Sequence, residues 1–166
     1  MRKISLFALM LVSLSANAFS PYNLGAQIGI GSIESSNSTV KGINGSFRIH
    51  PYLSAEAGYI EHGNVSAFNG DVDASSFYLA AKPTYPIGRF ELHAKAGLNY
   101  YDASLSSANA WESGSQSGIG LVLGVGADLF LMRQLSIGAS LQSFGMEVMD
   151  ESARASSLTF NVHYHF

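Results

Sequence analysis

Six charged side chains stand within stretches of the chain that otherwise alternate between apolar and small polar residues. An isolated charge in a protein interior costs several kcal/mol, so buried charges persist only when they are paired. Both signs are present and the residues follow one another closely, so we predict an ion-paired network in the interior of the protein. A gate for small ions is a second interpretation of the same residues. The six are Arg48, Glu56, Lys82, Glu91, Lys95 and Asp128, of which the first two flank one tight turn, the middle two flank another and the last two lie on neighbouring strands.

Three histidines have the chemistry of metal ligands. His163 and His165 are two residues apart and share one face of an extended segment, and His93 could lie nearby. A zinc site needs three or four ligands with partners that orient each imidazole, and this spacing supplies only two. The chain has no cysteine. We therefore predict no metal and no cofactor, and leave open whether these histidines bind metal.

A run of alternating glycines resembles a phosphate-binding loop. Such a loop leads from a strand into a helix, and no helical period follows this one. We interpret the glycines as small positions on the inward row of a strand, which leave room for long interior side chains. The glycines are Gly118, Gly120, Gly124 and Gly126, and the side chains are Arg48, Lys82 and Lys95.

The elements that would position these residues are strands. The last nine residues alternate between apolar and polar side chains, which indicates a strand with one apolar and one polar face. Seven earlier segments show the same period, and no amphipathic helical period competes with them. The predicted strands are residues 22–31, 42–49, 53–59, 76–85, 90–101, 118–130, 135–142 and 158–166. Pro83 cannot donate to a ladder, so we expect a bulge or an early strand end there.

The connections between these strands alternate between short and long. The short ones are the turns 50–52, 86–89 and 132–134, and the long polar ones are 32–39, 61–73, 102–117 and 145–155. Short turns at one end and long loops at the other are typical of outer-membrane barrels. Eight strands would place both termini at the short-turn, periplasmic end and four loops outside.

The apolar rows carry no charge, and all six network residues fall on the opposite rows. A charge facing the middle of the bilayer costs about 2 to 4 kcal/mol, so this segregation indicates lipid outside and a polar interior. Charged residues make up only 13% of the chain, and no basic patch suggests nucleic acid. The fold class predicted is an all-β, eight-stranded antiparallel up-and-down transmembrane β-barrel, present as a monomer.

The first 18 residues have the pattern of a secretory signal peptide. Arg2 and Lys3 form the charged start, residues 4–14 the apolar run and Ala16-Asn17-Ala18 the cleavage site. The apolar run is too short to span a membrane. We therefore expect residues 1–18 to be removed and residues 19–166 to form one domain in the outer membrane of a Gram-negative cell.

Residues 19–166 resemble the OmpA-like and OmpX-like eight-stranded outer membrane β-barrels. The signal peptide, the strand count, residues 89–97 before Asn99-Tyr100-Tyr101 and the terminal strand 158–166 carry the resemblance. It implies that Tyr164 and Phe166 belong to the C-terminal signal recognised by the barrel-assembly machinery. The chain ends at the barrel, so the peptidoglycan-binding role of full-length OmpA is not carried over.

The predicted function is structural and surface-exposed rather than enzymatic. A lipid A deacylase of this architecture would need a Ser and a His side by side on the lipid-facing wall, where the apolar rows contain neither. Palmitoyl-transferring barrels begin with an amphipathic helix, for which residues 19–23 leave no space. Trp111, near the middle of a long polar loop, is the candidate surface contact, although it could equally fold back onto the rim. Expected partners are outer-membrane lipid and lipopolysaccharide, the assembly machinery and a host or cell-surface ligand.

Two other functions remain open at this point. A narrow passive pore for ions or small solutes would use the same interior charges. A soluble, lipocalin-like ligand binder would need the apolar rows to face inward and the charges outward. The direction in which each row points therefore decides between a membrane protein and a soluble one.

Overall fold

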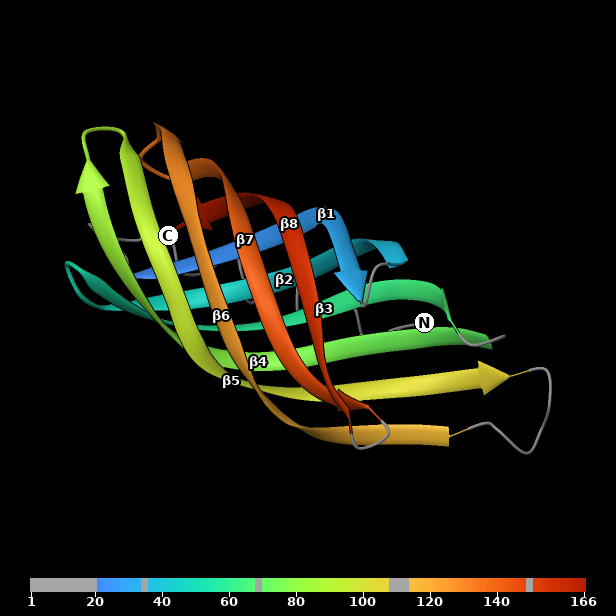
Figure 1. Cartoon of the computed structure of the whole chain (residues 1–166). Helices are drawn as coiled ribbons and strands as arrows, with labels where there is room; N and C mark the ends of the chain where they lie inside the picture. The colour runs from blue at the N-terminus through green and yellow to red at the C-terminus, as the bar shows by residue number, and fades with distance from the viewer. Residues whose placement is uncertain (1–20, 34–35, 68–69, 108–113, 149–150) are drawn as a thin grey trace, which may run out of the picture.

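The protein is a closed barrel of eight antiparallel strands in sequential order (Figure 1). A computed structural model describes residues 21–33, 36–67, 70–107, 114–148 and 151–166. The strands are β1 (Tyr22–Ile33), β2 (Ser36–His50), β3 (Leu53–Ala67), β4 (Gly70–Ile87), β5 (Phe90–Ser107), β6 (Gly114–Met132), β7 (Leu135–Val148) and β8 (Glu151–His165). The predicted fold class and strand count are confirmed.

The barrel closes because β1 pairs with both β2 and β8. Tyr22 lies opposite Phe47 on β2, and Leu24 lies opposite Tyr164 on β8. Closure gives the backbone groups of every strand a partner on both sides, which lipid cannot supply, and it removes the sheet edges within the membrane. In the described part of the chain, no helix is long and apolar enough to cross a membrane.

The two rows of each strand face the directions that the sequence predicts. The apolar rows point outward; Ile119, for example, is 74% exposed and Phe160 63%. Glu56, Lys82, Glu91, Lys95 and Asp128 are buried inside the barrel, and Arg48 is half-buried there. An apolar exterior around a charged interior is the reverse of a lipocalin-like binder, so that alternative is excluded.

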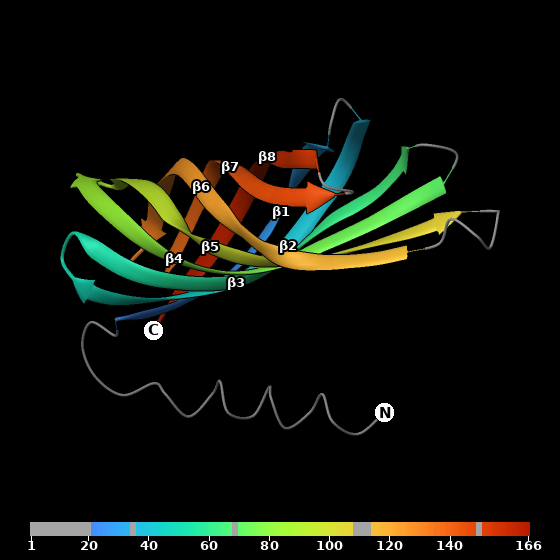
Figure 2. The ribbon, with the colours of Figure 1, turned by 60° about the horizontal axis from the view of Figure 1, so that its bottom comes forward.

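The three short turns are confirmed, at Pro51–Tyr52, Gly88–Arg89 and Arg133–Gln134. Both ends of the barrel domain lie on the same rim as these turns. The backbone N–H of Phe166 donates to the carbonyl of Tyr22 at 3.1 Å, and Figure 2 shows the C-terminus beside the start of β1. Outer-membrane barrels have their short turns on the periplasmic side, so we assign this rim to the periplasm.

The four predicted long loops are largely wrong, because the strands continue through most of them. β3 and β4 pair as far as Ala67 with Gly70, and β5 and β6 as far as Leu105 with Gly114. Loss of apolar alternation marks where lipid ends, whereas Ser, Asn and Gly can still pair backbone to backbone in water. Apolar alternation alone therefore underestimates the length of the strands at their outer ends.

The expected bulge or early end at Pro83 is also wrong. β4 runs on to Ile87, and its register with β5 is the same at Ala81 with Ala96 and at Thr84 with His93. The N–H of Thr84 donates to Tyr52, so the nitrogen of Pro83 faces the other neighbour, β5. Pro83 therefore omits one ladder hydrogen bond without shifting the register.

Beyond the membrane the barrel wall divides into two sheets. Along the described residues, pairing between β6 and β7 stops at Val122 with Phe144, and pairing between β2 and β3 stops at Lys41 with Glu61. One outer sheet is formed by β3 to β6 and the other by β7, β8, β1 and β2. Figure 1 shows the ends of β3 to β6 side by side and reaching farther than the other strands.

Candidate functional site

The centre of the barrel interior is organised around Glu56, which is only 1% exposed. One carboxylate oxygen accepts from Lys95 at 2.5 Å and from the Tyr78 hydroxyl at 2.9 Å, and the other faces Lys82 at 3.2 Å. These residues come from β3, β4 and β5, whose tilt brings their inward rows to one level. One acid thus pairs with two buried amines, and it also accepts a hydrogen bond from the tyrosine.

Asp128 on β6 is the second acid of the network. It lies 3.7 Å from the Lys82 amine, 3.3 Å from Nδ1 of His93 and 3.5 Å from Nδ1 of His163. Arg48 instead pairs with Glu91 at 2.7 Å. Ion pairs thus join strands across the lumen, rather than the residues that flank one turn, because strand tilt displaces neighbouring rows.

Neutral polar groups complete this polar layer. Gln142 on β7 accepts from the Lys95 amine at 3.1 Å, and its amide donates to Gln27 at 2.8 Å and to Thr159 at 2.9 Å. These contacts link β5, β7, β1 and β8. The polar layer therefore spans the whole cross-section of the barrel.

Above the polar layer lies an apolar layer that the sequence analysis missed. Phe144 and Val122 are fully buried, and the Phe144 ring packs edge-on against His62 and Tyr78 at 4.9 and 5.8 Å. Most of the layer lay just outside the predicted strand bounds. Extending each alternation by one to three residues would have found it. The apolar layer comprises Val40, Ile60, Tyr101, Val122, Phe144 and Ala155.

His93 connects a serine to an acid in the order of a hydrolase triad. Its Nε2 lies 3.4 Å from the hydroxyl of Ser140 and its Nδ1 lies 3.3 Å from Asp128. Ser140 is buried, and its hydroxyl already accepts from the Asn161 amide at 2.7 Å. A nucleophile must meet its substrate, so this arrangement holds the interior together rather than catalysing a reaction.

Two of the histidines named as possible metal ligands, His93 and His163, meet at Asp128, whereas His165 makes its hydrogen bond elsewhere. His163 contacts Asn44 at 3.3 Å through Nε2, and His165 contacts the hydroxyl of Ser136 at 2.9 Å. Within the part of the chain that the structure describes, no group of three or more suitable side chains could hold a metal ion. Their geometry here is that of hydrogen-bonded interior residues.

The interior glycines of β6 make room chiefly for side chains of β5. A Cβ at Gly118 would meet Tyr101, and one at Gly126 would meet His93. Of the three long side chains predicted to need this space, only Lys95 lies near one of the glycines. Its Cβ is 3.6 Å from the position that a Cβ at Gly124 would take. Arg48 and Lys82 are not among the nearest neighbours of any of the four glycines, because their strands, β2 and β4, do not pair with β6.

Two remaining candidates lie at opposite ends of the barrel. Trp111 falls outside the described residues. Tyr164 is half exposed on the outer wall, and its ring lies 5.1 Å from that of Phe166 at the periplasmic rim. This pair is accessible from outside, and its recognition by the assembly machinery stays a prediction.

Residues 4–166 match the family model described as the outer membrane protein beta-barrel domain. The chain belongs to this family. Membership places the barrel in a Gram-negative outer membrane, with its apolar rows in lipid. No curated protein sequence shows significant similarity to the chain.

Solved structures share the fold of this outer membrane barrel at low sequence identity. Neisserial surface protein A superposes with a TM-score of 0.75 at 17% identity, covering 90% of this chain and 100% of that one. Ail, the attachment invasion locus protein of Yersinia pestis, gives 0.59 at 16%, covering 91% and 100%. The outer membrane enzyme PagL gives 0.50 at 14%, covering 84% and 97%. The fold is thus shared with surface proteins and with an enzyme.

Proposed function

We propose that this outer membrane barrel is a rigid platform that displays its outer strand ends to a partner outside the cell, either a host surface or another cell. The observation that carries the proposal is the combination of a filled lumen and a hydrogen-bonded sheet that continues past the membrane. A filled lumen favours a structural role over transport. An ordered outer sheet provides a surface of defined shape.

The filling of the lumen has two chemically different parts in series. An ion that crossed the polar layer would still have to enter the apolar layer, where Val122 and Phe144 are fully buried. Apolar constrictions exclude hydrated ions because they do not hold water. The layers together disfavour a passive pore.

The outer sheet of β3 to β6 has the features of a contact surface. Its edge on β6, at residues 114–121, has no ladder partner on the side of β7 in the described structure. Unpaired backbone groups at such an edge can accept an added strand from another protein. Two proteins with this fold, a neisserial surface protein and an attachment invasion locus protein, have names that agree with contact outside the cell.

The test shortens one outer sheet and leaves the membrane part intact. Replacing residues 104–115 by Asn-Gly would join Ala103 to Gln116, which already lie opposite each other. We expect bacteria that carry this variant to bind cultured epithelial cells or neighbouring bacteria several-fold less than wild type. Heat-dependent gel mobility would show that the barrel still folds.

The matched control shortens the other sheet in the same way. Replacing residues 146–153 by Asn-Gly would join Gly145 to Arg154, which are also paired. This control should keep most of the binding. Equal binding by wild type and both variants would contradict the proposal.

A narrow ion pore remains the second candidate, favoured only by the charges of both signs in the polar layer. Such a pore would be gated by the pairs of Lys82 or Glu91. Planar-bilayer recordings in which Lys82→Ala and Glu91→Ala leave the frequency of conductance events unchanged would remove the gate hypothesis.

A further inference from the structure

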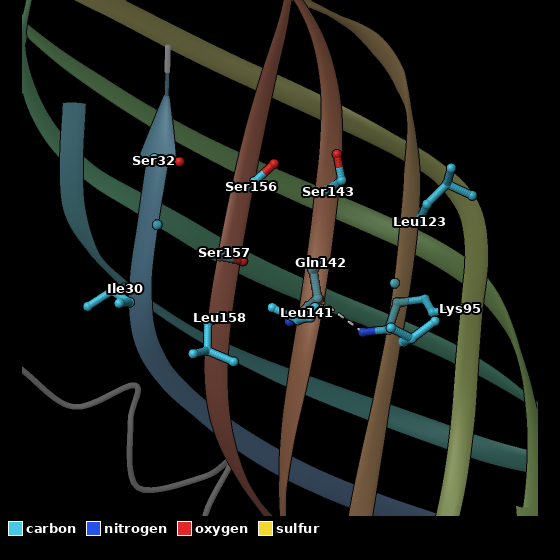
Figure 3. Close-up of a pocket in the computed structure, with 13 residues that line it drawn as sticks. Ile30, Ser32, Lys95, Leu123, Leu141, Gln142, Ser143, Ser156, Ser157 and Leu158 are labelled. Carbon is cyan, nitrogen blue, oxygen red and sulfur yellow. Dashed lines mark hydrogen bonds between the residues drawn. The ribbon is translucent and has the colours of Figure 1, made fainter. Parts of the chain in front are cut away.

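A groove lies on the outer wall of the barrel where β1, β8, β7 and β6 run side by side (Figure 3). Its volume is about 700 Å³. Gly31 and Gly124 are part of the lining, and the interior residues Lys95, Gln142 and Ser157 border it from the side of the lumen. The lipid-facing part of the lining, the aliphatic floor, is formed by Ile30, Leu123, Val125, Leu141 and Leu158.

Three serines form a polar row at the outer end of this floor. Ser32 lies opposite Ser156, and Ser156 lies opposite Ser143, one step outward from the aliphatic residues of the same strands. Figure 3 shows the three hydroxyls at the same end of the groove. None of them has a hydrogen-bond partner within the described protein. A hydroxyl that faces lipid without a partner is unfavourable, so this row favours an external hydrogen-bonding group.

Arg154 continues the same stripe toward the outside. It precedes Ser156 by two residues on the exposed face of β8 and lies opposite Gly145, which leaves the neighbouring position open. From the outside inward, β8 thus presents a guanidinium, a hydroxyl and then the aliphatic Leu158. A lipid with a phosphorylated headgroup has the same order of chemistry, and guanidinium pairs well with phosphate.

We propose that this groove, the glycolipid groove, binds a phosphorylated, acylated glycolipid of the outer leaflet. An acyl chain lies on the aliphatic floor, the serine hydroxyls bond to sugar, ester or amide oxygens, and Arg154 faces a phosphate. A glycolipid fits better than a phospholipid because three adjacent hydroxyls match its many oxygen atoms. The proposal rests on the membrane topology and not on the proposed surface display.

The test measures lipid retention by native mass spectrometry of the whole protein in detergent. The probes are purified bisphosphorylated lipid A, its dephosphorylated form, phosphatidylethanolamine and phosphatidylglycerol. In the double variant Ser143→Leu with Ser156→Leu, two hydrogen bonds are lost and the groove is filled. At about 1 kcal/mol for each bond, retention of lipid A should fall at least roughly tenfold.

Leucine is compatible with a lipid-facing wall, so this double variant should still fold. The matched control is Ser75→Leu, an outward serine of β4 on the opposite wall, which should retain lipid A like wild type. Arg154→Gln should reduce retention of the phosphorylated form more than that of the dephosphorylated form. The backbone of Glu147 pairs with Ser152 farther out along β7 and β8, and Glu147→Gln should not weaken retention.

Three results would overturn the proposal: unchanged retention of lipid A by the double variant, an equal loss in Ser75→Leu, or retention of either phospholipid as strong as that of lipid A. The cell-binding experiment is independent of these readouts. If the barrel binds cells but not lipid A, only the proposal of the glycolipid groove fails. If it binds lipid A but not cells, only the proposed surface role fails.

Discussion

At the scale of single residues, the acid at the centre of the polar layer carries the largest energetic consequence. Glu56→Gln would leave the amines of Lys82 and Lys95 without their shared counter-charge, although Asp128 lies 3.7 Å from Lys82. Removing one partner of a buried pair typically costs about 3 to 5 kcal/mol. We expect a loss of that size in the free energy of unfolding, measured by urea titration of the barrel in lipid vesicles.

Glu61 on the same strand supplies the control. It pairs with Lys41 at 2.9 Å, but both side chains are exposed beyond the lipid-facing girdle. Water and salt screen exposed pairs, so Glu61→Gln should change stability little. Similar losses in the two variants would show that the central pairs are not what holds the interior.

Gly63 and Gly88 are the residues whose backbone needs glycine. Their φ angles are +75° and +64°, where a Cβ costs roughly 1 to 2 kcal/mol. A Cβ at Gly63 would also collide with the carbonyl oxygen of Thr39, whereas nothing lies within 4 Å at Gly88. Gly63→Ala should therefore destabilise the barrel more than Gly88→Ala in the same urea titration, and the opposite order would contradict this account of Gly63.

At the scale of elements, the terminal strand combines a structural and a recognition role. The side chain of Phe166 lies on the rim beside Tyr164, and only its backbone bonds to β1. If the assembly machinery recognises the ring, Phe166→Ser should lower the amount of folded barrel in cells several-fold. Refolding of the purified variant into detergent should be nearly normal, as judged by gel mobility with and without heating.

Tyr85→Ser is a suitable control for this experiment, since Tyr85 is an exposed aromatic of β4 near the same rim. It should assemble normally in cells. If Phe166→Ser impairs refolding in detergent as much as assembly in cells, the residue acts through stability and not through recognition.

At the scale of the whole molecule, the series arrangement of the polar and apolar layers determines permeability. Wild-type protein should show no steady conductance in planar bilayers, since the apolar layer excludes water. The double variant Val122→Ser with Phe144→Ser replaces two fully buried side chains of that layer by smaller polar ones. It should admit water and produce stepwise conductance.

The control for conductance places the same change on the lipid face. The double variant Leu123→Ser with Leu141→Ser changes one lipid-facing residue on β6 and one on β7, and it leaves the side chains that fill the lumen unchanged. It should remain silent. Steady channels in wild type, or silence in a folded Val122→Ser, Phe144→Ser variant, would show that the apolar layer is not the seal.

The sequence by itself determined the direction of every strand face. Alternation from Leu158 to Phe166, repeated in seven other segments, fixes which side chains meet lipid, because successive residues of a strand point to opposite faces. The cost of a charge in lipid then places Glu56, Lys95 and the other charges inside. These arguments use only residues that are close in sequence, so a single sequence is enough to predict the barrel and its location in a membrane.

Only the tertiary structure decided how the faces meet. The pairing of Glu56 with Lys82 and Lys95, and of Arg48 with Glu91, depends on strand tilt and register around a closed cylinder, which no single segment records. The row of Ser32, Ser156 and Ser143 likewise joins the two ends of the chain through the pairing of β1 with β8. Contacts between distant residues are set by closure of the barrel, and closure is a property of all eight strands together.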